Sequence, residues 1–268
     1  MNRKKIGFIG AGNMATAIIK GIIRNDESSK ADLCVFDTDP EKVEAMKKIG
    51  VGAAESGEAL TASSDIIVLA VKPQSYDAVL SALKPAANES KVFVTIAAGI
   101  SIAYVRNGLG VNCPMVRVMP NTPLLLGKGA TAMCRSENIS DEDFEEVRKM
   151  FALSGIVEEL PESQMNAIIA VNGSSPAYIY LFAKAMVDYA ESVGIDPATA
   201  LGLVCKTLEG SAEMLRNSGD TPEKLIEKVC SKGGTTIEAM NVLTGSGVPD
   251  IIMKAMAACT KRAEELGK

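Results

Sequence analysis

The chain has 268 residues, and 47% of them are apolar, which is enough for a well-buried core and for one or two domains. A net charge of −5 argues against a surface that binds nucleic acid or anionic membranes, and no apolar run is long enough to span a bilayer. Histidine is absent, which removes His-based triads and His-dependent metal sites. Any chemistry must therefore use carboxylates, lysine, tyrosine, hydroxyls, thiols, backbone dipoles or an organic cofactor.

The first part of the chain alternates short β-rich runs with amphipathic segments, which predicts a doubly wound parallel sheet. Several runs are almost continuously apolar, as parallel strands covered on both faces are. We expect strands at 5–9, 33–36, 65–71, 91–97, 115–119, 130–134 and 156–160. Helices are expected at 14–24 and 40–49, the second with Asp39 as N-cap and Pro40 as its first residue.

After about Glu162 the strand pattern stops and helical patterns fill the rest of the chain. These patterns cover 162–195, 196–219, a segment from Thr221, and 249–268. Asp196 and Thr221 are each followed by a proline, and we expect them to be the N-caps of the second and third patterns. We therefore expect a Rossmann-like dinucleotide-binding domain at 1–162 and an all-helical domain at 163–268. The apolar surface of those helices is either intramolecular core or an interface with a second copy, as in symmetric homodimers.

The start of the chain and its cysteines indicate the compartment. The segment MNRKKIGFIG lacks the apolar core and the small-residue cleavage site of a secretory signal. Six cysteines are scattered without a C-x-x-C pair or a local cluster, which favours reduced thiols over disulfides or a metal site. We expect a cytoplasmic protein without a bound metal.

The segment GAGNMA directly follows the first expected strand and precedes a helix, and it matches G-x-G-x-x-A. Gly10 permits a tight turn, and Gly12 lets the backbone approach a pyrophosphate at the helix N-terminus. The pattern alone is weak, but its place between a strand and a helix is the context that supports it. It predicts that a dinucleotide contacts Ile9, Gly10, Ala11, Gly12, Asn13 and Met14.

Asp37 follows the second expected strand, where a carboxylate would meet the adenosine ribose. A carboxylate there accepts a hydrogen bond from a 2′-hydroxyl and repels a 2′-phosphate, so Asp37 favours NADH over NADPH. The alternative is that Asp37 only caps the turn, and Lys42 lies nearby in the sequence.

The carboxyl ends of the later strands are expected to complete the cofactor site, because ligands of open α/β sheets bind there. Ala97, Ala98 and Gly99 are small enough to leave room for a cofactor. Lys72 is either a surface lysine or a cation that faces the nicotinamide or the substrate. The further expected cofactor residues are Ser56, Ala70, Val71, Lys72, Pro73, Ala97, Ala98 and Gly99.

The chain resembles the pyrroline-5-carboxylate reductase family over essentially its full length. The segments that carry the resemblance are IGFIGAGNMA, AVKPQ, AAGIS, RVMPNTP, NGSSPAYIY and VCSKGGTTIEAM, and the last two are specific to that family among Rossmann dehydrogenases. The resemblance implies reduction of 1-pyrroline-5-carboxylate to L-proline with NADH or NADPH, the last step of proline biosynthesis. It also implies homodimers formed through the helical domain, often assembled further into rings.

The segment SKGGTT interrupts the helical region with a Gly-Gly turn that opens the next helix. Such a turn offers free backbone N–H groups and a partial positive charge, which together form an anion site. Ser231, Gly233, Gly234 and Thr235 are therefore expected to bind the substrate carboxylate. The resemblance makes Thr236 the catalytic residue, with its hydroxyl on the ring nitrogen of the substrate.

Three further residues depend on the resemblance. It places Glu162 near the nicotinamide and the substrate, although an exposed carboxylate at a helix start is the alternative. Lys232 replaces a proline common in the family, and Ser175 replaces a glycine. Lys232 either tightens carboxylate binding or is merely solvated.

Two rival functions differ in the residues that they require. β-Hydroxyacid dehydrogenases use a G-x-x-x-K-x-x-x-N spacing, whereas Lys184 is followed four residues later by Asp188 and Gly173 lies too far upstream. A non-catalytic NAD(H)-sensing protein would need the cofactor turn alone, and the SKGGTT segment argues against it.

Overall fold

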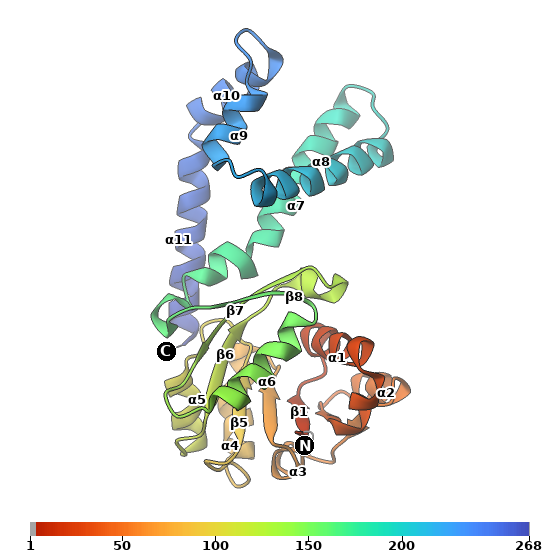
Figure 1. Ribbon diagram of the computed structural model, residues 1–268, viewed down its shortest axis with the longest axis vertical. Helices are drawn as coiled ribbons and strands as arrows, with labels where there is room; N and C mark the ends of the chain where they lie inside the picture. The colour runs from red at the N-terminus through yellow and green to blue at the C-terminus, as the bar shows by residue number, and fades with distance from the viewer. Residues whose placement is uncertain (1–3, 268) are drawn as a thin grey trace. The chain divides into compact units, whose positions relative to one another are not determined.

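The structure is a computed structural model that describes residues 4–267, apart from the side chain of Glu27. Contacts between Cα atoms divide the chain into two compact units. The sheet unit runs to Ser174 and takes up the chain again from Ala257, and the helical unit comprises Ser175–Met256 (Figure 1). Residues 163–174 and 257–267 thus belong by their contacts to the sheet unit. The sequence-based boundary at residue 162 stays a prediction.

The sheet unit is built on one eight-stranded sheet with the order β3-β2-β1-β4-β5-β6-β7-β8. Its strands are β1 (Ile6–Ile9), β2 (Leu33–Phe36), β3 (Gly52–Ala53), β4 (Ile66–Leu69), β5 (Val92–Thr95), β6 (Met115–Met119), β7 (Gly129–Arg135) and β8 (Gly155–Glu159). All neighbouring strands are parallel except β6 and β7, which pair antiparallel. The Rossmann-like α/β class is confirmed.

The direction of β7 and β8 corrects the expectation of a wholly parallel sheet. Residues 120–128, between β6 and β7, hold only the short turn η3 (Thr122–Leu126). A parallel return needs a crossover of about a dozen residues or more, so this short link reverses the chain. The two-residue strand β3 was not predicted, because Gly52 and Ala53 carry no strand-like apolar pattern.

Helices cover both faces of the sheet (Figure 1). On β4, Ile66 and Val68 join the cluster formed with α1 and α6, whereas Ile67 and Leu69 join the cluster formed with α4 and α5. This alternation is why β4 is buried along its whole length. The helical segments are α1 (Asn13–Asn25), η1 (Glu27–Asp32), α2 (Pro40–Lys48), α3 (Gly57–Ser63), η2 (Pro73–Ser75), α4 (Tyr76–Leu83), α5 (Ile102–Leu109), α6 (Asp141–Ala152), η4 (Glu162–Gln164) and η5 (Ile169–Gly173).

The other helices are α7 (Ser175–Ser192), α8 (Pro197–Asn217), α9 (Pro222–Val229), α10 (Thr235–Gly245) and α11 (Val248–Leu266), the last of which ends in the sheet unit. Predicted caps are confirmed where side chains accept from the first turn: Asp39 from Glu41 N at 3.0 Å and Asp196 from Thr199 N at 2.8 Å. Thr221 caps α9 in the same way.

The single helical pattern expected over 162–195 is divided into η4, η5 and α7. Gly173, the last residue of η5, packs closely against β6, because a Cβ there would lie 2.5 Å from Met119 Cε. Asn172 Nδ2 donates to Met119 O and Ala130 O at 2.8 and 2.9 Å. Contacts with β6 and β7 therefore end the helical pattern before α7 starts.

The helical unit buries almost nothing within one chain. Across residues 175–256, all of which the structure describes, only Pro176, Ala190 and Ala200 are buried. Leu181 and Met253 are more than two-thirds exposed. So much exposed apolar surface is typical of a protein–protein interface.

Within residues 4–267, no single helix is long and apolar enough to cross a membrane. The bent pair of α10 and α11 reaches that length and apolar character only when the two helices are taken together.

Candidate active site

The cofactor turn, Gly10–Asn13, links β1 to α1 and is fixed by the strands beside it. Gly10 has a φ of 98°, and a Cβ there would lie 2.7 Å from Ala70 O. Its N–H donates to Phe36 O at 2.7 Å. Only glycine has both the required conformation and the required size at this position.

Gly12 differs from Gly10, because a Cβ on Gly12 would meet no heavy atom of the described residues within 4 Å. Gly12 is the N-cap of α1 and has no side chain to occupy the first N–H groups of the helix. The first turn of α1 also carries no acidic side chain. An open, uncapped helix N-terminus is suited to a dinucleotide pyrophosphate, so these residues fit the cofactor that the sequence predicts.

Asp37 holds the cofactor turn to the end of β2. Its Oδ2 accepts from Ala11 N at 2.8 Å and its Oδ1 accepts from Asp39 N at 2.9 Å, while Lys42 Nζ lies 3.9 Å from Oδ1. The capping role that we considered as an alternative is therefore present. A carboxylate has about four lone-pair sites, so capacity for a ribose hydroxyl remains, and that contact stays a prediction.

The ends of β4 and β5 are tied together by a tyrosine that the sequence analysis did not single out. Tyr76 is fully buried, and its hydroxyl lies 3.0 Å from Leu69 O and 2.8 Å from Thr95 Oγ1. Burial raises the pKa of Tyr76, so the phenol stays neutral and structural. An aromatic residue early in an amphipathic helix was too common a signal to reveal this role.

The remaining expected cofactor residues of this region vary in exposure. Ala70, Val71 and Pro73 are half-buried, and Lys72 is exposed at the start of η2. Ser56 accepts a hydrogen bond from Ala59 N at 3.0 Å and so caps α3.

The three small residues after β5 differ in their surroundings. Ala97 and Gly99 are buried, and Ala98 is half-buried. Gly99 is small because it packs against the end of α11, where a Cβ would lie 2.4 Å from Ala263 O.

Glu162 is bound to its surroundings through one oxygen. Oε1 accepts from Ile102 N, the first residue of α5, at 2.8 Å, and it lies 3.7 Å from Arg117 Nη1. Arg117 Nη2 donates to Asn166 Oδ1 at 2.5 Å. Glu162 therefore joins η4 to α5 and to β6, which is more than an exposed carboxylate at a helix start would do.

The sequence analysis missed Arg117 as the partner of Glu162. The Arg117 side chain is only 5% exposed, and burial lowers its pKa while the charge of Glu162 opposes that shift. A charged residue inside the apolar strand segment MVRVM was the signal that could have revealed a buried ion pair.

The substrate turn, Cys230–Gly234, joins α9 to α10. Gly234 N donates to Ser231 O at 3.0 Å, and Gly233 has a φ of 73°. Gly234 is the N-cap of α10, and a Cβ there would lie 2.4 Å from Ser231 Oγ. The turn thus presents a second helix N-terminus without a side-chain cap, as predicted for a carboxylate site.

Thr235 and Thr236 are the first two residues of α10. Thr236 borders a cavity of about 1130 Å³ in the helical unit, lined mainly by the second half of α8 and by α9. Its apolar wall includes Met214, Leu225 and Ile226. Thr236 therefore lies beside a space whose lining combines apolar side chains with polar ones such as Ser211 and Asn217.

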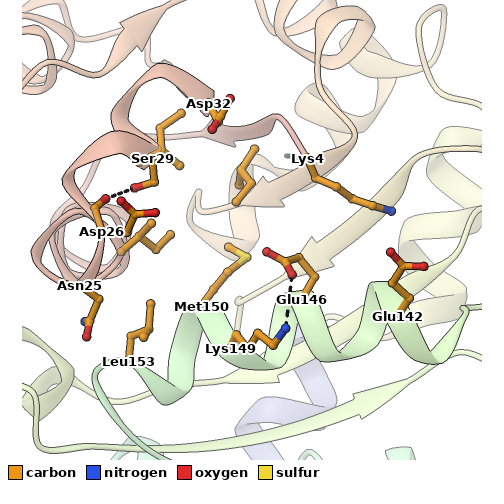
Figure 2. Close-up of a pocket in the computed structure, with 13 residues that line it drawn as sticks. Lys4, Asn25, Asp26, Ser29, Asp32, Glu142, Glu146, Lys149, Met150 and Leu153 are labelled. Carbon is orange, nitrogen blue, oxygen red and sulfur yellow. Dashed lines mark hydrogen bonds and ion pairs between the residues drawn. The ribbon is translucent and has the colours of Figure 1, made fainter. Parts of the chain in front are cut away.

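A different cavity, of about 600 Å³, lies in the sheet unit at the amino ends of β1 and β2 (Figure 2). Glu142, Glu146 and Lys149 of α6 line it from one side, and Lys4 and η1 line it from the other. None of the expected site residues lines this cavity. It lies at the strand ends opposite to those that bind ligands in open α/β sheets.

Comparisons with known proteins match both parts of the chain. A family model described as pyrroline-5-carboxylate reductase dimerisation matches residues 162–266, and one described as NADP oxidoreductase, coenzyme F420-dependent, matches residues 5–99. The pyrroline-5-carboxylate reductase of Escherichia coli (strain K12) is 37% identical over 266 residues, covering 99% of each chain. The chain belongs to the pyrroline-5-carboxylate reductase family.

Other members of the pyrroline-5-carboxylate reductase family are similar over the same length. The reductase of Methanosarcina acetivorans is 34% identical and covers 100% of each chain. A crystal structure of Plasmodium falciparum pyrroline carboxylate reductase with NADP bound matches with a TM-score of 0.92 at 30% identity, again over 100% of both chains. The resemblance identified from sequence segments is confirmed.

Membership of this reductase family also decides against the two rival functions. Lys184, the candidate lysine of a β-hydroxyacid dehydrogenase, is exposed and forms an ion pair with Asp188 along α7. Within residues 4–267, no group of three or more His, Cys, Asp or Glu side chains could hold a metal ion.

The six cysteines are free thiols. Burial raises the pKa of Cys113 to about 11 and that of Cys134 to about 12, so these two thiols are unreactive at neutral pH.

Proposed function

We propose that this protein reduces 1-pyrroline-5-carboxylate to L-proline with hydride from NADH or NADPH, the last step of proline biosynthesis. The observation that carries the proposal is a pair of glycine-capped helix N-termini, one in each unit, in a chain that belongs to this reductase family. One N-terminus suits a pyrophosphate and the other suits a carboxylate.

The sheet unit would hold the cofactor through the cofactor turn and the ends of β2, β4 and β5. Backbone N–H groups at the start of α1 would bind the pyrophosphate, and Asp37 would accept from the adenosine ribose. Bound NAD(P)H supplies a hydride from its nicotinamide ring.

The helical unit would hold the substrate through the substrate turn. Backbone N–H groups of Gly233, Gly234 and Thr235, with the hydroxyl of Ser231, would bind the substrate carboxylate. Thr236 Oγ would hydrogen-bond to the ring nitrogen and so orient the C=N bond. A solvent proton on that nitrogen gives an iminium, and hydride addition to its carbon gives the amine of proline.

This chemistry is compatible with a chain that lacks histidine. The substrate nitrogen would take its proton from water, and the hydride would bring its electron pair to the imine carbon, with NAD⁺ or NADP⁺ as the by-product. Positioning then supplies most of the rate, since well-oriented reactants gain effective molarities of roughly 10⁵ M or more. Glu162 would support this positioning through the hydrogen bond that it accepts from Ile102 N, at the start of α5.

The preference for one nicotinamide cofactor is a separate part of the proposal. Asp37 favours NADH, because its charge opposes a 2′-phosphate. Steady-state assays of the purified protein with 1-pyrroline-5-carboxylate and either NADH or NADPH measure this directly. Oxidation of neither cofactor would exclude the reductase, whereas faster NADPH oxidation would exclude only the role given to Asp37.

The Thr236→Ala variant distinguishes a reductase from a protein that only binds the dinucleotide. We expect kcat to fall by about a hundredfold, because loss of one preorganised hydrogen bond to a reacting group costs about 10²–10³ in kcat. Thr236→Ser keeps the hydroxyl and should retain most of the activity, and the Kd for the dinucleotide should stay constant in both variants. Equal turnover of Thr236→Ala and the unchanged protein would refute the catalytic role.

We further propose that residues 163–268 form the substrate-binding and dimerisation domain and that two copies pair through the helical unit. The family model matched to residues 162–266 and the exposed apolar side chains of α7, α8 and α11 support this pairing. Light scattering on the purified protein should give at least twice the mass of one chain. Assembly of dimers into rings, a cytoplasmic location and the lack of nucleic-acid or membrane partners stay predictions.

A further inference from the structure

The C-terminal part of α11 belongs to the sheet unit although the helix starts in the helical unit. Ala263 is only 3% exposed, and Cys259 Sγ lies 3.3 Å from Ser174 Oγ, just after η5. These contacts anchor the end of the helix on the sheet unit, where the C-terminal label stands in Figure 1.

The end of α11 meets the β5–α5 loop, residues 96–101, at Gly99. A Cβ on Gly99 would lie 2.4 Å from Ala263 O and 2.9 Å from Leu266 Cβ. From the other side of the same contact, a Cβ on Gly267 would lie 2.3 Å from Gly99 O. The two backbones therefore approach so closely that neither glycine can carry a side chain without a shift.

Contacts on the other side of the same loop hold it at its junction with α5. Glu162 Oε1 accepts from Ile102 N at 2.8 Å, and Ser101 Oγ accepts from Tyr104 N at 3.1 Å. Gly99 has a φ of 83°, a conformation that glycine adopts without the usual strain. The loop is thus held between α11 at Gly99 and the capped start of α5.

The position of this loop in the sheet decides which part of a dinucleotide it can touch. The strand order β2-β1-β4-β5 puts the adenosine ribose at the end of β2 and the pyrophosphate at the β1 turn. The nicotinamide half must then extend past β1, toward the ends of β4 and β5. Ala97 and Ala98 follow β5 at this edge of the sheet, separated from the strand only by Ile96.

We propose that the last turn of α11, from Ala263 to Gly267, is a positioning element for the nicotinamide half of the cofactor, and that it acts through Gly99 and the β5–α5 loop. This inference rests on the proposed reductase function. Loss of the turn frees one side of the loop, so the nicotinamide loses a fixed surface while the adenosine half keeps all of its contacts.

Two variants remove or displace this contact. One ends the chain after Arg262, and the other, Gly267→Ala, adds a Cβ that collides with Gly99 O. Glu264→Ala is the matched control, because Glu264 is an exposed residue of the same helix. Calorimetry on the whole protein measures the Kd for NADH and NADPH, and the Kd for ADP-ribose and 2′-phospho-ADP-ribose, which lack the nicotinamide.

We expect both variants to raise the Kd of the preferred dinucleotide about tenfold and that of its nicotinamide-free fragment less than twofold, with Glu264→Ala unchanged. A general loss of structure would instead weaken dinucleotide and fragment alike and lower the Tm. If the shortened chain does not fold, Gly267→Ala alone decides. Equal weakening of both ligands, or of neither, would overturn this inference. Failure of the unchanged protein to bind any dinucleotide would instead overturn the proposed function.

Discussion

The cofactor turn and the substrate turn both place glycine at the N-cap of a helix, but they differ in what surrounds them. Gly10 packs against Ala70, and Asp37 holds the N–H of Ala11. In the substrate turn, a Cβ on Gly233 would meet no described atom within 4 Å, and Gly234 contacts Ser231 of the same turn. One turn is fixed by the sheet unit around it, whereas the other is shaped mainly by its own hydrogen bond.

This difference agrees with the burial of the two units. The cofactor turn follows a strand whose residues are all buried, and the substrate turn lies in a unit with three buried residues in 175–256. A site built on a self-sufficient core needs no second copy to form its shape. The substrate turn instead belongs to a unit whose exposed apolar side chains we propose a second copy covers.

The largest effect is expected for Gly10→Ala, which changes the cofactor turn, the turn that its neighbouring strands hold in place. The new Cβ meets the Ala70 backbone, and a φ of 98° is strained for alanine, so the free energy of unfolding should fall by about 3 kcal/mol. Dinucleotide affinity should fall by at least about a hundredfold. Urea unfolding and calorimetric titration measure the two effects, and a fully stable variant would show that Ala70 does not restrain this turn.

The next largest effect is expected for Gly12→Ala, which separates binding from folding at the same turn. Gly12 has a φ of −72° and an open side, so alanine fits, and unfolding should change by less than about 1 kcal/mol. The methyl group would occupy the space of the pyrophosphate, raising the Kd of the dinucleotide by about thirtyfold. If the Kd of the dinucleotide is unchanged, the cofactor does not bind against Gly12.

A smaller effect is expected for Gly233→Ala in the substrate turn. The φ of 73° costs alanine about 1–2 kcal/mol without a collision, so the turn should relax, raising the KM for 1-pyrroline-5-carboxylate by about tenfold. Gly219→Ala is the matched control, because Gly219 has a φ of 75°, an equally open side and a place outside the turn. If both variants raise the KM equally, the effect is one of stability.

The smallest effect is expected for Lys232→Gln, because Lys232 is exposed and water screens its charge. Loss of the cation should raise the KM for the anionic substrate about two- to threefold, and the increase should shrink at high salt. Lys224→Gln removes another exposed lysine of the helical unit and should leave the KM unchanged. Equal KM values for the two variants would show that Lys232 does not contribute to substrate binding and is only solvated.

Much of this fold could be predicted because its signals are local. Apolar runs located the central strands, and an Asp or Thr followed by proline located the starts of α2, α8 and α9. Both glycine turns were identified from residues that are adjacent in the sequence. The direction of β7 was not predicted, because a strand pattern in the sequence does not show which way the strand runs in the sheet.

The contacts that the sequence did not reveal join residues far apart in the chain. Arg117 in β6 lies close to Glu162 in η4, and Gly99 packs against Ala263 near the end of α11. Each pair depends on packing that no local pattern encodes. The small residues after β5 were interpreted as room for a cofactor, and for Gly99 a close helix backbone is a second physical reason.

The return of α11 means that the sheet unit is not a continuous stretch of chain. A ribosome that has made every residue up to Met256 has supplied all eight strands, yet Gly99 still lacks its neighbours Ala263 and Leu266. The unit that is made first is therefore completed by residues that are translated after the whole helical unit. A stop codon at any position from 257 to 263 would spare the whole sheet and still remove the backbone that packs on Gly99.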